Sequence, residues 1–186
     1  MAMHVALWGC WTIFAAYWYL SAGRAKPVAR RQSRAAEWAW RIPLWVAAAL
    51  LILAPFPPPD GFLFAPGRGS AWTGVAITTT GLAICIWARR TLGGNWSSAV
   101  SLKQGHELIQ SGPYRFVRNP IYTGLILMFL GTACAVDRRS ALLALALAIA
   151  SYGIKLKQEE QVMQRQFPEA YARYRQRVKA LIPFVF

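Results

Sequence analysis

The stretch IYTGLILMFLGTACAVDRRSALLALALAIASYGI, residues 121–154, contains two apolar runs that are separated only by Asp137, Arg138 and Arg139. Each run approaches the ~20 apolar residues that an α-helix needs to cross a bilayer. A connection of three residues is long enough to join two antiparallel helices. The stretch therefore predicts a tight hairpin of two membrane-spanning helices.

Three further apolar runs precede this hairpin. They cover residues 5–20, 42–56 and 70–88, and the second ends at a run of three prolines, residues 57–59. Some of the five runs are short, so flanking residues or local thinning of the bilayer must complete the spans. We expect residues 1–186 to form one all-α integral membrane domain with about five transmembrane helices, and a four-helix alternative stays open.

The composition agrees with a membrane protein. Of the 186 residues, 56% are hydrophobic and only 15% are charged, and the nine Trp and seven Tyr are typical of membrane interfaces. Cys10, Cys85 and Cys134 each lie inside an apolar run without the spacing of a metal site. We expect no bound metal and no disulfide framework.

The distribution of Lys and Arg predicts the orientation. Of the 21 basic residues, all except Arg68, Arg138 and Arg139 lie between the first and second runs, between the third and fourth, or after the fifth. Lys and Arg are enriched in cytoplasmic segments, so we expect an outside N-terminus and a cytosolic C-terminus. Basic residues follow the first run rather than precede it, which favours an uncleaved anchor. This topology and anionic lipids explain the net charge of +14 better than nucleic-acid binding does.

Two segments outside the apolar runs are candidates for function. The first, residues 91–124, contains turn signals at Gly93-Gly94-Asn95 and Gly112-Pro113, and Pro120 suits the first turn of the fourth helix. We expect an ordered cytosolic loop that packs on the bundle, because long connections without regular structure are uncommon unless they bind something.

The second segment begins at Lys155 and has helical spacing. Glu159 shares a helix face with Val162 and Met163, so we expect its carboxylate to point inward and that of Glu160 to be solvated. Pro168 predicts the start of a second short cytosolic helix.

These segments carry a recognisable pattern. Residues 112–124 read GPYRFVRNPIYTG, Glu159-Glu160 follow the hairpin, and residues 167–178 read FPEAYARYRQRV. The pattern resembles the isoprenylcysteine carboxyl methyltransferase family, which belongs to a wider group that includes membrane phospholipid N-methyltransferases. The resemblance covers about residues 92–183, whereas residues 1–90 match only as hydrophobic helices. It implies a methyltransferase-like core with a cofactor pocket in residues 91–186.

The resemblance implies methyl transfer from S-adenosylmethionine, taken from the cytosol, to a lipid-like acceptor from the bilayer. Carboxyl O-methylation of an isoprenylcysteine-type acceptor is the expected reaction, with N- or S-methylation of a phospholipid or other small acceptor as the alternative. The cofactor-binding residues that it implies are His106, Leu108, Ile109, Tyr114, Asn119, Pro120, Tyr122 and Glu159. Arg118, just before this turn, is the expected partner of the cofactor's carboxylate. Lys155, Arg173 and Arg177 are expected to position the acceptor. Asn119 replaces the His of the best-known members, and Asn donates hydrogen bonds but does not titrate near neutral pH.

Each of these residues also has an ordinary structural explanation. Arg118 could be a positive-inside anchor, Glu159 could pair with Lys155, and His106 could be an exposed loop residue. Tyr114 and Tyr122 could be interfacial aromatics, and the Trp residues of the first run are expected to be packing or interface groups. A non-catalytic lipid-binding protein and a nicotinamide-dependent membrane reductase are the alternative classes. The short Ala- and Arg-rich chain is typical of a prokaryotic inner-membrane protein.

Overall fold

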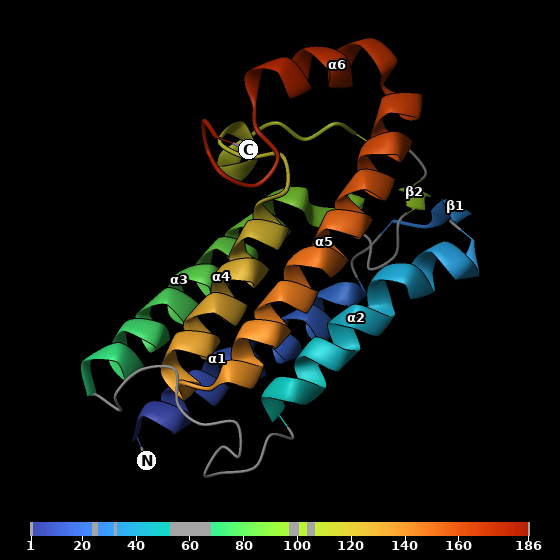
Figure 1. The fold of residues 1–186 in the computed structure, drawn as a ribbon. Helices are drawn as coiled ribbons and strands as arrows, with labels where there is room; N and C mark the ends of the chain where they lie inside the picture. Colours follow the sequence, from blue (N-terminus) through green and yellow to red (C-terminus); the bar gives the residue numbers. More distant parts are fainter. Residues whose placement is uncertain are drawn as a thin grey trace.

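The computed structural model describes residues 2–23, 26–31, 33–52, 68–96, 101–103 and 107–185. Figure 1 shows five long helices that run side by side, with a sixth, short helix across one end. The elements, in chain order, are α1 (Ala2–Ala22), β1 (Val28–Arg31), α2 (Arg34–Ile52), α3 (Arg68–Leu92), the 3-10 turn η1 (Gly93–Asn95), β2 (Ser101–Lys103), the 3-10 turn η2 (Gly112–Arg115), α4 (Pro120–Val136), α5 (Arg139–Gln166) and α6 (Pro168–Arg177).

The helices confirm an all-α integral membrane protein. Within the described ranges, the four helices α1, α2, α3 and α5 are each long and apolar enough to cross a bilayer. Helix α4 is also apolar but has 17 residues, which corresponds to about 25 Å of helix. The two short strands β1 and β2 pair antiparallel, with Val28 opposite Lys103 and Arg31 opposite Ser101.

The three basic segments lie at one end of the bundle. In Figure 1 the C-terminal ends of α1, α3 and α5 and the N-terminal ends of α2 and α4 point to the same end. Two contacts tie the first and second segments together, from the Lys26 backbone N–H to the Gly94 carbonyl at 2.9 Å and from Arg89 Nη2 to the Ser21 carbonyl at 2.6 Å. The Arg118 backbone N–H donates to the Lys179 carbonyl at 2.8 Å and joins the third. We refer to this end as the basic end, and its assignment to the cytosol stays a prediction.

The predicted hairpin between α4 and α5 is present. Asp137 takes a left-handed backbone conformation, with φ of 51°, and ends α4, while Arg138 is extended and precedes α5. Pro120 and Pro168 each occupy the first residue of a helix, as predicted. The fifth apolar run and the helical segment that begins at Lys155 form one continuous helix, α5, which ends at Gln166.

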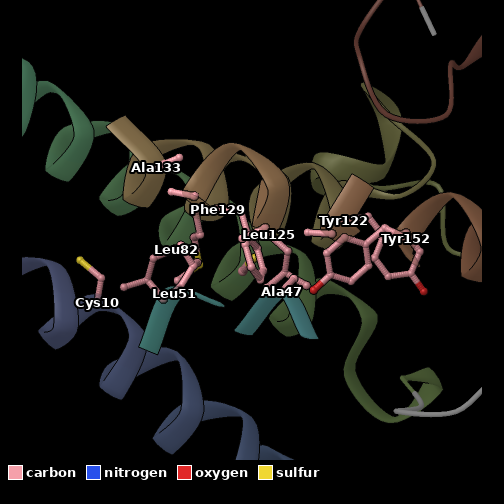
Figure 2. Close-up of a cluster of buried hydrophobic side chains, with 14 of the residues drawn as sticks. Cys10, Ala47, Leu51, Leu82, Tyr122, Leu125, Phe129, Ala133 and Tyr152 are labelled. Carbon is pink, nitrogen blue, oxygen red and sulfur yellow. The ribbon is translucent and has the colours of Figure 1, made fainter. Parts of the chain in front are cut away.

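Helices α3 and α4 pack with their backbones in close contact. A Cβ atom built on Gly74 would lie 2.5 Å from the Gly131 carbonyl oxygen, and one built on Gly124 would lie 2.6 Å from the Gly81 carbonyl oxygen. Small residues at matching positions permit such an approach between membrane helices. Figure 2 shows the inner face of α4, where Leu125 and Phe129 lie near buried residues of neighbouring helices.

Candidate functional site

A cavity of about 480 Å³ lies at the basic end and extends into the bundle. Its volume is in the usual range of small-molecule pockets, about 300–1,000 Å³. Two of its surfaces have distinct chemistry. The polar wall consists of Tyr114, Asn119, Tyr122, Lys155 and Glu159. The aromatic wall consists of Trp11, Phe14 and Trp18 from α1 and Trp40 and Trp45 from α2.

Tyr114 is held in place by its local turn. Gly112 has a φ of 58°, a backbone conformation that glycine adopts without steric cost, and Pro113 follows at the start of η2. Tyr114 is consequently buried, and its carbonyl accepts a hydrogen bond of 2.5 Å from the Tyr174 hydroxyl. Burial raises the pKa of Tyr114, and the Glu159 charge adds to the effect, so the phenol is neutral. Tyr114 can therefore serve as a neutral hydrogen-bond donor and as a ring face.

Lys155 and Glu159 lie one turn apart on the inner face of α5. Lys155 Nζ is 4.0 Å from Glu159 Oε1, and it lies 4.3 Å from the centre of the Trp40 ring and 5.5 Å from that of Tyr122. The Tyr122 side chain lies close enough to the Glu159 carboxylate to interact with it electrostatically. An ammonium group gains electrostatic stabilisation over aromatic faces. The predicted inward orientation of Glu159 is confirmed, because it lines the cavity with Val162 and Met163.

Arg118 also lines the cavity, but most of its donors are engaged by protein groups. Its Nε and Nη2 donate to Glu160 Oε1 at 3.0 and 2.6 Å, and its Nη1 donates to the carbonyls of Arg175 and Val178. Side-chain exposure is 8% for Arg118 and 13% for Glu160, so this is a mostly buried ion pair. The geometry gives Arg118 a clear structural role.

The prediction that Glu160 is solvated is wrong. The C-terminal segment folds back over the end of α5, and Arg175 Nε lies 4.0 Å from Glu160 Oε2, opposite the contact with Arg118. Helical spacing predicted an outer position for Glu160, but the C-terminal segment covers this part of α5, and Glu160 also lines the cavity.

The C-terminal segment docks on the start of α4. Asn119 donates to the Ala180 carbonyl twice, from its backbone N–H at 3.0 Å and from Nδ2 at 3.3 Å. Thr123 Oγ1 donates to the Leu181 carbonyl at 2.7 Å. The Asn119 side chain thus acts as a donor in a backbone contact, while the residue also lines the cavity.

Sequence patterns did not identify the aromatic wall. Trp11, Phe14 and Trp18 follow one helix face at spacings of three and four, but the α1 tryptophans were predicted to be interface or packing groups. Their rings contact one another: Trp11 and Phe14 have centroids 6.1 Å apart, and Phe14 stacks on Trp18 at 4.3 Å. The spacing was visible in the sequence, although nothing in it connected this face with residues more than 90 positions away.

Several of the predicted site residues occupy other positions. Pro120 is fully buried as the first residue of α4 and does not line the cavity. Arg173 and Arg177 are exposed on α6: Arg173 lies 3.6 Å from Glu169, and Arg177 donates to Gln110 at 3.3 Å. His106 lies outside the described residues. Leu108, Ile109, Tyr114, Arg118, Asn119, Tyr122, Lys155 and Glu159 do line the cavity.

A polar cluster at the rim was not predicted. Asn95 Oδ1 accepts from Lys26 Nζ at 3.2 Å and from the Glu107 backbone N–H at 3.3 Å, and Lys26 also lies 3.5 Å from the Glu107 carboxylate. Asn95 and Glu107 line the cavity, so the cluster links the end of α1 to the loop after α3 beside the polar wall.

A comparison with known families gives a decisive match. The family model described as phospholipid methyltransferase matches residues 70–170, which is more than half of the chain. The chain belongs to the phospholipid methyltransferase family. The match covers most of α3 and all of α4 and α5, and it confirms the resemblance that the motifs indicated. The matched residues include the whole polar wall, whereas all five residues of the aromatic wall lie outside the match.

Individual relatives bear different names. This chain is 29% identical over 146 residues to the cobalt-zinc-cadmium resistance protein CzcN of Cupriavidus metallidurans, with 77% of this chain and 63% of that protein covered. It is 25% identical over 130 residues to protein-S-isoprenylcysteine O-methyltransferase B of Arabidopsis thaliana, with 66% of each covered. It is 30% identical over 115 residues to the nickel-cobalt-cadmium resistance protein NccN of Alcaligenes xylosoxydans xylosoxydans, with 60% of this chain and 52% of that protein covered. The chain spans between about half and two thirds of the length of these relatives.

Proposed function

We propose that this protein transfers a methyl group from S-adenosylmethionine to a lipid-like acceptor at the basic end of the bundle. The preferred acceptor group is a carboxylate of the isoprenylcysteine type. The observation that carries the proposal is that one cavity joins a wall of charged, hydroxyl and amide groups to a wall of aromatic rings. A polar cofactor and an apolar acceptor can meet in such a cavity.

The polar wall fits the chemical groups of S-adenosylmethionine. Glu159 suits the ammonium group or the ribose hydroxyls, because charge-assisted hydrogen bonds are the stronger ones. Tyr114 and Tyr122 offer hydroxyls and ring faces, and Leu108 and Ile109 offer apolar contact for adenine. When bound, the cofactor supplies an electrophilic methyl group on a sulfonium.

Lys155 is the residue that we assign to the acceptor. Its ammonium group lies among Glu159, Trp40 and Tyr122 in the cavity, where it can orient an acceptor carboxylate. A carboxylate oxygen needs no general base, since it carries no proton to lose, so alignment and exclusion of water supply the rate enhancement. An amine acceptor would have to lose a proton, which calls for a base. This difference favours the carboxylate over a phospholipid amine.

The exposed Arg173 and Arg177 contribute less to this proposal than the sequence suggested. Arg118 acts in it chiefly as a positioning residue, which holds the turn before α4 against Glu160 and the C-terminal segment. Lys155 thus takes over the acceptor contact that the resemblance distributed among three basic residues.

Binding titrations in detergent test the cofactor. We expect S-adenosylmethionine to bind and NADPH not to bind, and we expect Glu159→Gln to weaken binding. Glu169→Gln is the matched control, because Glu169 is an exposed carboxylate paired only with exposed Arg173 among the contacts described. Binding of NADPH instead would support a reductase, and binding of neither compound would support a non-catalytic lipid-binding protein.

Transfer of a radiolabelled methyl group tests the reaction. The acceptor panel should include S-prenyl N-acetylcysteines, their methyl esters, phosphatidylethanolamine and water-soluble N-acetylcysteine. We expect label in the free carboxylates with a prenyl tail and none in the esters, which have no acceptor oxygen free. Label confined to phosphatidylethanolamine would replace the carboxylate with an amine as acceptor.

A further inference from the structure

The aromatic wall lies entirely outside the residues that the family model matches, and a contact between Trp11 and α4 closes its inner end. Trp11 Nε1 donates to Thr132 Oγ1 at 3.0 Å, and its ring meets that of Phe129 edge-on at a centroid distance of 5.3 Å. Both rings line the cavity, and Thr132 is fully buried. The contact joins α1 to α4 across the inner end of the cavity.

Beyond this contact the bundle is filled by side chains. Cys10 and Leu51 are each 8% exposed and Ala133 is 2% exposed, and Figure 2 shows these residues on the far side of Phe129 from Tyr122. The cavity is therefore closed at the level of Trp11 and Phe129 and does not continue through the bundle.

Helices α1, α4 and α2 line the closed part of the cavity over nearly the same length. The lining residues run from Trp18 to Trp11 on α1, from Tyr122 to Phe129 on α4, and from Trp40 to Ala48 on α2. The two ends of each range are seven or eight residues apart, which at a rise of 1.5 Å per residue corresponds to about 10–12 Å. A zigzag hydrocarbon with bonds of about 1.5 Å spans that depth with about eight to ten carbon atoms.

The side of the cavity between α1 and α2 reaches the outer surface of the bundle. Helix α1 packs chiefly on α3, whereas α2 packs chiefly on α5, so the two helices that carry the aromatic wall belong to different packing pairs. Trp45 lines the cavity and is also 57% exposed. A ring that faces both the cavity and the outer surface marks a lateral opening toward lipid.

We propose that the space between α1 and α2 is a binding site for the hydrocarbon tail of a single-tailed acceptor, and that Trp11 with Phe129 sets the longest tail that fits. The inference rests on the proposed function for the identity of the reacting head group, but the tail site is defined by its own walls. The tail lies along the aromatic wall, with its end at the Trp11–Phe129 contact and its polar head beside Lys155.

The test is a series of S-alkyl N-acetylcysteines from hexyl to tetradecyl, with binding measured in lipid nanodiscs without cofactor. Each methylene that reaches the aromatic wall should strengthen binding, by less than the roughly fourfold step of transfer from water because the tail leaves lipid, and the gain should stop near decyl, where the tail reaches the Trp11–Phe129 contact. Trp11→Ala should move this break to longer tails. Ala48→Phe, on the facing helix, should move it to shorter tails and provides a second measurement if Trp11→Ala does not fold.

Trp72→Ala is the matched control, because Trp72 is 51% exposed on α3 and does not line the cavity. Its break should stay at the wild-type length. A decyl compound with a terminal diazirine should label the peptides that contain Trp11 or Phe129. The tail site is refuted if affinity shows no break, if Trp11→Ala and Ala48→Phe both keep the wild-type break, or if the label lies elsewhere.

The two proposals fail separately. Tail binding with the expected break but without methyl transfer would remove the proposed reaction and keep the tail site. Methyl transfer that is equally efficient for all tail lengths would keep the reaction and remove the tail site.

Discussion

The α3–α4 pair and the α1–α2 side of the bundle are built from equally apolar helices, yet they pack differently. In α3–α4 the glycines meet: Gly74 faces Gly131 and Gly81 faces Gly124, so the backbones touch. On the other side, rings such as Trp18 and Trp40 line a cavity of about 480 Å³. Lipid tails are as apolar as these side chains, so association depends on close packing rather than on the hydrophobic effect. Side-chain size therefore decides which helices join and which leave room for a ligand.

The close packing of α3 on α4 also supports the residues of the cavity that lie at the start of α4. Asn119 and Arg118 directly precede α4, and Tyr122 lies in its first turn. The tight pair thus gives these residues a rigid support, while the adjacent aromatic wall can admit an apolar molecule. Sites held by rigid elements keep their reactive groups in register more accurately than sites on loops.

The largest effect should come from breaking the tight pair. A Cβ at position 81 would overlap the Gly124 carbonyl and lie 2.9 Å from the Met128 backbone nitrogen. We expect Gly81→Val to lower the free energy of unfolding by about 3 kcal/mol or more, at the upper end of overpacking, because backbone atoms have to move. Unfolding in mixed detergent and SDS micelles, followed by circular dichroism, measures the change.

The control for this variant is Gly153→Val on α5, where an added Cβ would meet nothing within 4 Å. Its stability should stay within about 1 kcal/mol of wild type, because only helix propensity changes. Equal stability of the two variants would show that α3 and α4 are not in backbone contact.

The second largest effect on stability should come from breaking the ion pair between Arg118 and Glu160. Arg118→Ala should cost about 3 kcal/mol of unfolding free energy, because it leaves the mostly buried Glu160 without its main partner. The double variant Arg118→Ala/Glu160→Ala should have a higher free energy of unfolding than Arg118→Ala alone, because it leaves no unpaired carboxylate buried. Arg173→Ala should change stability by at most about 1 kcal/mol, since its ion pair is exposed.

A third comparison separates the neighbouring acids on α5. Glu159→Gln should weaken S-adenosylmethionine binding by about 1.5–3 kcal/mol, the scale of hydrogen bonds to charged groups, with little loss of stability. Glu160→Gln should mainly reduce stability, because its contacts are to Arg118 and Arg175. Calorimetric titration and unfolding of both variants provide the measurements. Equal losses of affinity would contradict the division of roles.

The smallest effect should come from the open side. Leu44 is partly buried and lines the cavity, so Leu44→Ala enlarges an existing space and should cost about 1 kcal/mol or less. Met128→Ala, at a fully buried position in the tight pair, should cost about 2–5 kcal/mol. The same micelle unfolding assay compares them, and a larger loss for Leu44→Ala would indicate that the cavity is filled by protein.

Much of the architecture followed from local sequence features. The apolar runs marked the helices, Pro120 and Pro168 marked two helix starts, and helical spacing placed Glu159 with Val162 and Met163. The position of Glu160 was wrong because its partners, Arg118 and Arg175, are 42 and 15 positions away along the chain. Helical spacing describes one helix and contains no information on what covers its outer face.

The sequence by itself determined that this chain forms apolar helices, that its basic segments gather at one end, and that its C-terminal half carries the family pattern. Each of these depends on residue types within one or two turns of helix or along short connections. Only the tertiary structure decided that glycines join α3 to α4 and that Trp11 closes a cavity against Phe129. Helix α1 is apolar on nearly every side, so its periodicity cannot indicate which face turns inward, and contact with a distant helix makes that choice.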